Sequence, residues 1–114
     1  MNNPISTKTA EHYLWGDGCD GWHLVNQENL SVIQERVPPG KSERLHYHEK
    51  SRQFFFVLEG TASLQVDGSQ FVLHEQEGLE VSPTDHHLLR NDSATDLVFL
   101  VISSPRSQGD RVNV

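Results

Sequence analysis

Residues 40–60 read GKSERLHYHEKSRQFFFVLEG, and this stretch carries two histidines separated by a single residue. In an extended strand, alternate side chains point to the same face, so the side chains of His46 and His48 can converge on one point. Imidazole is a ligand that suits zinc, iron, nickel and copper. Gln53 follows on the same stretch and offers a carbonyl oxygen. The stretch therefore predicts part of a metal site on a strand.

A third histidine of this kind lies in residues 78–91, GLEVSPTDHHLLRN. Strand alternation places His87, Leu89 and Asn91 on one face and His86 on the other. We therefore expect His87 to be the ligand, although a β-bulge that reverses the alternation would select His86 instead. Only a closed or folded-over sheet brings His87 beside the first pair. The alternative to a metal site is a hydrogen-bonded polar cluster of the same side chains.

The spacing in residues 40–60 resembles the first sequence motif of the cupin family. That motif has a glycine, five residues, His-any-His, three or four residues, a glutamate, six residues and a second glycine. Gly40, His46, His48 and Gly60 match it at every spacing, and Gln53 stands where the glutamate is usual. The first motif is therefore complete apart from one change of ligand type.

The second cupin motif is similar to residues 78–91. Its glycine, its proline-bearing turn and its histidine with an asparagine four residues later look like Gly78, Pro83, His87 and Asn91. The turn lacks the usual glycine, and the segment is a little short. The resemblance implies an all-β fold, a double-stranded β-helix (jelly-roll) cupin barrel. It also implies a divalent first-row transition metal (Fe, Mn, Ni, Zn or Cu) bound by His46, His48, Gln53 and His87.

Turn signals recur at short intervals and divide the chain into many short strands, which is typical of an all-β sandwich or barrel. Asp67-Gly68 predicts a hairpin turn. Pro38-Pro39-Gly40 ends the expected strand 30–37. Within one domain, 1–114, we expect N-terminal strands and an arm in 1–29, the barrel core in 30–103 and a C-terminal tail in 104–114, which is loop-like over 104–111. The expected strands are 12–15, 22–25, 30–37, 53–59, 61–66, 69–73, 79–82, 86–90 and 97–103.

Both tryptophans, Trp15 and Trp22, flank a glycine-rich turn near the N-terminus. We expect them to fill the core or an oligomer contact, and the alternative is a pocket wall or lid. Cys19 is the only cysteine of the chain, so no internal disulfide can form, and we expect it to be a buried apolar side chain. The absence of a disulfide favours a reducing, cytoplasmic location.

The chain has 16 acidic and 9 basic residues, a formal net charge of −7. Nucleic acids and anionic membranes require a basic face, so neither is an expected partner. The longest apolar run, residues 54–58, is far too short to span a bilayer. Both faces of the strand 53–59 are apolar, which predicts that a second copy covers the outer face in a homodimer. The alternative is that an N-terminal strand of the same chain covers it.

Two classes of function fit these residues. The first is a metal-dependent enzyme acting on a small organic molecule, either dioxygenase-like or isomerase-like; the second is a binding or sensor protein without turnover. A neutral amide in place of glutamate would leave a bound metal a stronger Lewis acid. A sugar-phosphate isomerase is a weaker option because it needs basic residues near the metal. Glu35, Tyr47, Glu49 and His86 have no assigned role, and His12, His23 and His74 are expected to lie away from any ligand.

Overall fold

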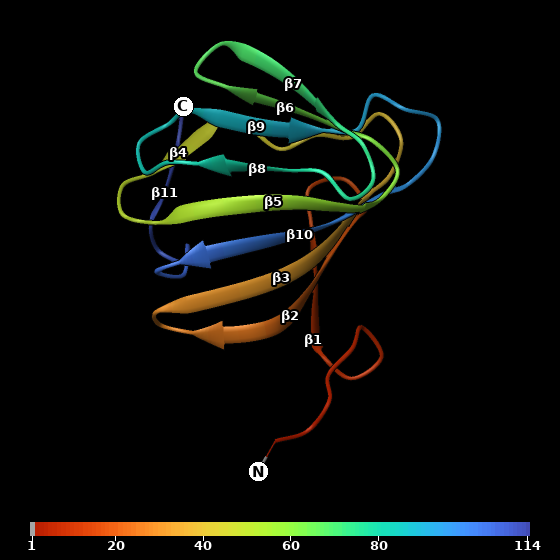
Figure 1. Ribbon diagram of the computed structural model, residues 1–114, viewed down its shortest axis with the longest axis vertical. Coiled ribbons are helices and arrows are strands. Elements are labelled where there is room, and N and C mark those ends of the chain that lie inside the picture. Colours follow the sequence, from red (N-terminus) through yellow and green to blue (C-terminus); the bar gives the residue numbers. More distant parts are fainter. Residues whose placement is uncertain (1) are drawn as a thin grey trace.

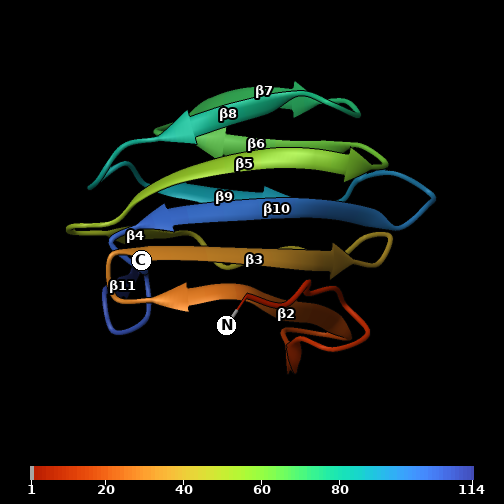
Figure 2. The same cartoon turned by 60° about the horizontal axis from the view of Figure 1, so that its bottom comes forward.

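The computed structural model describes residues 2–114, which form two stacked antiparallel sheets (Figures 1 and 2). The expected all-β jelly-roll fold is confirmed. The six-stranded sheet has the order β1 (Glu11–Trp15), β2 (Cys19–Gln27), β3 (Leu30–Val37), β10 (Leu97–Ser104), β5 (Arg52–Glu59) and β8 (Gly78–Val81). The five-stranded sheet has the order β11 (Arg111–Asn113), β4 (His46–His48), β9 (His87–Arg90), β6 (Ala62–Val66) and β7 (Ser69–Leu73).

The hydrophobic core lies between the two sheets because alternate residues of the strands point inward. Along β3, every second side chain from Ser31 to Val37 is buried, and β10 repeats this pattern from Leu97 to Ser103. Phe99, Leu64 and Leu89 are completely buried where the sheets face each other. The alternation read from the sequence therefore separates core positions from outer positions correctly in these strands.

Two tight connections have the backbone geometry that the sequence predicts. Asp67 and Gly68 both have positive φ, 47° and 85°, as the hairpin turn between β6 and β7 requires. Gly60 also has a positive φ of 82°, and a Cβ there would lie 2.5 Å from the carbonyl oxygen of Asp96. Only glycine fits at that position, which ends β5 and closes the first motif.

The N-terminal hairpin extends the six-stranded sheet at its edge. β1 and β2 pair antiparallel across the glycine-rich turn, as expected, but β2 begins at Cys19 and runs to Gln27. Cys19 is fully buried, which confirms its expected role as an apolar core residue. Figure 1 shows β1 beyond β2 and not across β5, so the alternative in which an N-terminal strand covers the outer face of β5 is wrong.

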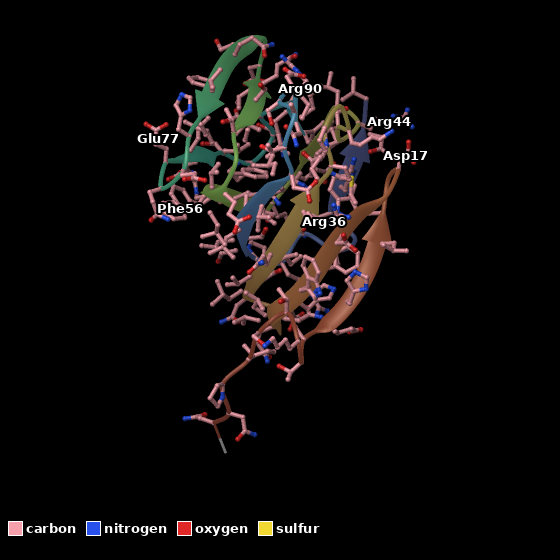
Figure 3. All side chains as sticks on the ribbon, turned by 90° about the vertical axis from the view of Figure 1, so that its right-hand side faces the viewer. Asp17, Arg36, Arg44, Phe56, Glu77 and Arg90 are labelled. Carbon is pink, nitrogen blue, oxygen red and sulfur yellow. The ribbon has the colours of Figure 1, made fainter. Side chains whose placement is uncertain are left out.

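The outer face of β5 is consequently open. Phe54 is 38% exposed, and its ring stacks on the ring of Phe56 at a centroid distance of 6.2 Å. Figure 3 shows Phe56 on the opposite side of the molecule from Arg44. The inward side chains of the same strand, Gln53, Phe55 and Val57, are buried, which confirms the predicted alternation.

The segment expected to be a loop-like tail contains a strand. Residues 105–110 are irregular, but β11 then pairs antiparallel with β4, with Arg111 opposite His48 and Asn113 opposite His46. Three residues are too few to show a period, and the pairing joins parts of the chain that are distant in sequence. The prediction of a loop through Arg111 was therefore wrong in its last part, and this error bears on the site.

Candidate metal centre

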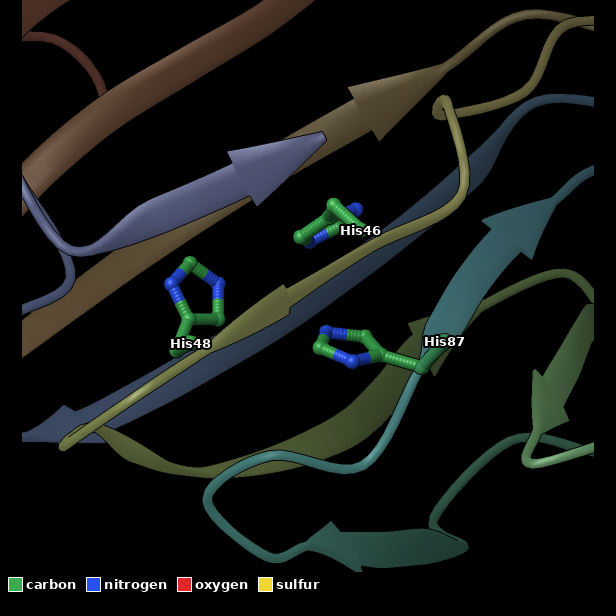
Figure 4. Close-up of side chains that lie close together, drawn as sticks. All are labelled: His46, His48 and His87. Carbon is green, nitrogen blue, oxygen red and sulfur yellow. The ribbon is translucent and has the colours of Figure 1, made fainter. Parts of the chain in front are cut away.

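Three histidines meet at one end of the barrel (Figure 4). His46 and His48 occupy alternate positions of β4, and His87 opens β9 directly opposite His46. All three side chains are at least 95% buried, with exposed fractions of 2%, 5% and 1%. One ring nitrogen from each lies within 4.8 Å of the other two. The fold thus brings together the three histidines that strand alternation selected, and His86 is exposed on the other face.

Backbone carbonyls orient two of the rings. Nδ1 of His46 lies 2.6 Å from the carbonyl oxygen of Arg44, and Nδ1 of His87 lies 2.9 Å from that of Asp85. A neutral imidazole that donates from Nδ1 presents a lone pair at Nε2, the form in which histidine binds a metal. Nδ1 of His48 is buried and has no hydrogen-bond partner among residues 2–114. This buried, unpaired nitrogen is what a ligand-binding site would be expected to contain.

The histidines are held in their neutral form. Burial lowers the pKa of His46 to about 3 and the pKa of His48 to about 4. Burial also lowers the pKa of His87. Metal ions compete with protons for imidazole nitrogens, so three imidazoles that stay unprotonated at neutral pH are prepared for coordination.

Gln53 reaches the same point from β5. Its side chain is 7% exposed, Nε2 donates to Oγ of Ser103 at 3.0 Å, and Oε1 lies 3.1 Å from Nε2 of His87. With the His87 proton on Nδ1, an amide oxygen and an imidazole lone pair face each other, an arrangement that a cation between them stabilises. The opposite amide orientation would instead let Gln53 donate to His87, as in a polar cluster without metal.

The donor set fits one first-row transition ion. Metal–nitrogen bonds of about 2.1 Å place the nitrogens of one coordination sphere up to about 4.2 Å apart. The observed limit of 4.8 Å is therefore within small side-chain adjustments of that geometry. Three neutral imidazoles and one amide oxygen suit zinc, iron, nickel, copper or manganese, and they do not single out one ion.

A cavity of about 400 Å³ opens beside the histidines. This volume is in the range of pockets that hold small organic molecules. Both polar and apolar side chains line it. The lining residues are Tyr13, Trp15, His23, Ile33, Glu35, Glu43, His46, His48, Gln53, Phe55, Val101, Ser107, Gln108, Gly109 and Arg111.

Two carboxyl groups share this cavity. Glu35 points inward from β3 and accepts a hydrogen bond of 3.0 Å from the hydroxyl of Tyr13. Burial and the charge of Glu43 raise the pKa of Glu35 to about 8. Burial also raises the pKa of Glu43 to about 7, and its carboxylate accepts the backbone N–H of Leu89. Burial therefore favours the protonated form of Glu35 inside the pocket.

A family model described as the Cupin domain matches residues 33–103, which is more than half of the chain. The chain belongs to the cupin family. This match includes the three histidines and Gln53, and it excludes both flanking segments that line the pocket.

Several known proteins resemble this chain in sequence or in structure. The polyketide synthase CurC of Streptomyces cyaneus is 35% identical over 63 residues, which are 54% of this chain and 41% of CurC. The chain thus spans less than two thirds of that relative. The structure of KdgF from Halomonas sp. has a TM-score of 0.84 at 15% identity and covers 93% of this chain and 96% of its own. The polyketide cyclase RemF of Streptomyces resistomycificus also has a TM-score of 0.84, at 17% identity, over 100% of this chain and 86% of its own.

The flanking segments of this cupin supply almost half of the pocket wall. Tyr13, Trp15 and His23 come from the N-terminal hairpin, and the turn before β11 contributes residues 107–109. Tyr13 lies opposite Gly21 across the hairpin, and a Cβ at Gly21 would collide with its ring. The glycine therefore makes room for the tyrosine that holds Glu35. No motif in the sequence signalled this arrangement.

One carboxylate fixes the C-terminal segment against the histidine strand. The side chain of Asp110 accepts hydrogen bonds from the backbone N–H groups of Glu49, Lys50 and Ser51 at 3.2, 3.0 and 2.8 Å. These three residues form the turn that joins His48 to Gln53. The bonds lower the pKa of Asp110 despite the cost of its desolvation. Asp110 thereby ties the last strand to the turn between two candidate ligands.

The remaining sequence expectations have mixed outcomes. His12 pairs with Asp20 at 2.7 Å, and His74 is exposed, so both lie away from the pocket as expected. The expectation was wrong for His23, which lines the cavity and has a buried, unpaired Nδ1. Strand alternation along β3 was the signal that could have placed Glu35 in the pocket. No equivalent signal existed for Glu43, which lies outside regular strands.

Proposed function

We propose that this cupin is a metal-dependent, isomerase-like enzyme that moves a proton on a small carbonyl or enol compound. The carrying observation is that His46, His48 and the carboxyl group of Glu35 line one cavity, with His87 within 4.8 Å of the other two histidines. A site of this kind combines an electrophile with a general acid or base. Polyketide proteins appear among both the sequence relatives and the structural neighbours, which supports a carbonyl-rich substrate.

His46, His48, Gln53 and His87 would hold the divalent ion. When bound there, the metal supplies Lewis acidity that polarises an oxygen of the substrate. The neutral ligand set supports this role because no ligand charge offsets that of the ion. Burial of the histidines also excludes bulk water from the side of the site that faces the core.

Glu35 would hold and move the proton. Its pKa of about 8 lies near neutral pH, where a group can both donate and accept a proton. The hydroxyl of Tyr13 donates a hydrogen bond to Oε2 of Glu35. Glu43 carries the nearest negative charge and so favours the protonated form of Glu35. The Tyr13 and Glu43 side chains thus set the orientation and the acidity of the proposed acid.

A phosphate-bearing substrate fits less well. The basic residues Arg36, Lys41, Arg52 and Arg90 are engaged with acidic partners away from the cavity. Among residues 2–114, Arg111 is the single lysine or arginine of the lining, and a phosphate dianion is usually met by several donors. We therefore favour a substrate that carries at most one negative charge near Arg111 over a sugar phosphate.

Dioxygenase-like chemistry is the second candidate, and Gln53 is the observation that favours it. If the amide oxygen binds a metal only weakly, open positions remain for two further ligands on the same ion. The identity of the metal separates the two candidates, because zinc does not change its oxidation state. Iron that oxidises and reduces in the protein would favour the dioxygenase-like reading.

The first experiment is elemental analysis of protein purified without added metal and without a histidine tag. We expect near-stoichiometric iron, manganese, nickel, zinc or copper in the native protein and none in the variant with His46→Ala and His48→Ala. His74→Ala is the matched control, since this histidine is exposed. Absence of metal even after reconstitution would contradict the enzyme proposal and leave a binding cupin without turnover.

We also propose a homodimer through the open face of β5. Phe54, which is 38% exposed, and the half-buried Phe56 stack on each other and form an apolar patch on this face. Phe54→Ser with Phe56→Ser should lower the mass in light scattering to that of one chain, and Phe71→Ser, an exposed phenylalanine of β7, is the control. A monomeric mass for the native protein at micromolar concentration would contradict this proposal.

A cytoplasmic location remains part of the proposal. The chain has one cysteine, and its thiol is buried and unpaired, which suits a reducing compartment. Among residues 2–114, there is no helix of the length and apolarity needed to cross a membrane. A fractionation experiment that finds the protein outside the cytoplasm would contradict the location.

A further inference from the structure

Arg111 lies on the same face of its sheet as the candidate metal ligands. β11 pairs with β4 so that Arg111 is directly opposite His48 and Asn113 is opposite His46. Directly opposed residues of an antiparallel pair point to the same face, with Cβ atoms about 5 Å apart. Since His48 lines the cavity, Arg111 lines it as well. β11, which the sequence did not predict, therefore places the positively charged Arg111 beside the histidines.

Among residues 2–114, the guanidinium of Arg111 forms no ion pair with a carboxylate. Its Nε donates to Oδ1 of Asn113 at 2.9 Å, and Nη2 donates to the backbone carbonyl of Arg44 at 3.4 Å. Both acceptors are neutral, and within residues 2–114 Nη1 donates to no protein acceptor. Four other basic residues of the chain form ion pairs with carboxylates: Arg36, Lys41, Arg52 and Arg90.

The acids of the cavity do not neutralise this cation. Glu35 is bonded to Tyr13, and Glu43 accepts from the backbone of Leu89. Neither carboxylate lies within ion-pair distance of Arg111, although the charge of Arg111 acts on the pKa of both. The positive charge at the rim is thus unpaired, and a carboxylate can accept two parallel N–H bonds from one guanidinium.

We infer that the pocket takes a small organic acid, whose carboxylate binds Arg111 while an adjacent hydroxyl or oxo oxygen lies at the histidine centre. This inference names the substrate class of the proposed function and rests on it. The register of β11 on β4 places Arg111 beside His48, so the acids to be tested carry their second oxygen one or two carbons from the carboxyl group. Trp15 and Ile33 supply apolar contacts for the rest of the molecule.

The test compares acids with their amides, which keep the shape and lose the charge. Salicylate is titrated against salicylamide, and 2-oxobutanoate against 2-oxobutanamide, into zinc-loaded protein by calorimetry. We expect each acid to bind about tenfold or more tightly than its amide, because hydrogen bonds between charged groups are the stronger ones. Equal binding of acid and amide, or no binding of either acid, would overturn the inference.

Variants of Arg111 test whether this residue binds the carboxylate of the acid. Arg111→Gln should weaken acid binding about tenfold and leave amide binding unchanged, and Arg111→Lys should recover part of the loss because it keeps the charge without the fork. Arg106→Gln is the control, since Arg106 lies in the same segment and does not line the cavity. Unchanged acid binding in Arg111→Gln would show that Arg111 is not the anchor.

Failure of the proposed function is distinguishable from failure of this inference. Metal content is measured before the titrations, and its absence bears on the proposed function alone. The titrations are then repeated on metal-free protein, where both acids should still bind more tightly than their amides, and only when Arg111 is present. A charge preference that is the same in Arg111→Gln would contradict the inference whether or not the protein holds a metal.

Discussion

The two sides of the pocket differ in origin and in chemistry. Residues 33–103, which match the cupin family model, contribute His46, His48, Gln53 and both pocket carboxyl groups, and they hold His87 beside these histidines. The segments outside this range contribute Trp15, His23, the tyrosine that holds Glu35, and Arg111. Under the proposed function, the shared fold would supply the reactive groups, and the flanking segments would determine which molecule reaches them. Substitutions on the two sides should accordingly change different quantities.

The largest effect is expected at Glu35, on the shared side. Glu35→Gln removes the proposed acid and should lower kcat by about 10²- to 10⁴-fold with unchanged metal content. The loss should be accompanied by disappearance of the pH dependence near pH 8 that its raised pKa predicts. Glu49→Gln, an exposed change, is the control. Full activity of Glu35→Gln on the substrate would remove Glu35 from the mechanism.

A substitution at Asp110 tests whether a residue outside 33–103 affects the metal ligands within that range. Asp110→Ala removes the acceptor of three backbone N–H groups in the turn between His48 and Gln53. Residues that position metal ligands are typically worth 10- to 100-fold in metal affinity, so we expect a loss of about tenfold against a competing chelator. The spectrum of the cobalt-substituted protein should change too, and Asp92→Ala should alter neither. An unchanged spectrum and affinity would confine Asp110 to a structural role.

Gln53→Glu tests a candidate metal ligand that lies within residues 33–103. A carboxylate at this position should tighten metal binding about tenfold, because it adds a negative charge beside the ion. The same change should destabilise the metal-free protein, since position 53 is 7% exposed and the charge is then unpaired. Gln34→Glu, on the outer face of β3, is the control. Unchanged affinity would argue that position 53 does not bind the metal.

Trp15→Ala should affect substrate binding alone. Loss of this wall residue should raise KM several-fold, from lost apolar contact, and leave kcat and metal content close to those of the native protein. Trp22→Ala is the matched control, because Trp22 packs beside His12 and does not line the cavity. A fall in kcat with unchanged KM would mean that the flanking wall takes part in the chemistry.

The smallest effect concerns stability. The folded-state pKa of Glu35 is raised from 4.5 to about 8, so the folded protein binds more protons than the unfolded chain between these values. Its contribution to stability is therefore present below pH 4.5 and is lost as the pH rises through 8. Glu35→Gln should raise Tm by several degrees at pH 9 and by less at pH 5. An equal shift in Tm at both pH values would contradict the raised pKa.

Much of the barrel was predictable because strand alternation is a local property. The side chains at 46, 48 and 87 followed from it, as did the turn at Asp67-Gly68, whose positive φ angles need only two residues. Arg111 was not predictable, since three residues of β11 carry no period and their partner strand lies about sixty residues earlier. Tyr13 and Glu43 enter the pocket through tertiary packing, which leaves no mark in the local sequence.

The pairing of β11 with β4 also sets an order of events during synthesis. β4 emerges from the ribosome about sixty residues before its partner, and until then one edge of the strand that carries His46 and His48 has unpaired backbone groups. The clamp by Asp110 also forms only at that stage. The nascent chain can therefore assemble most of its core before the histidine centre acquires its final geometry, so metal capture is expected to be a late step in its maturation.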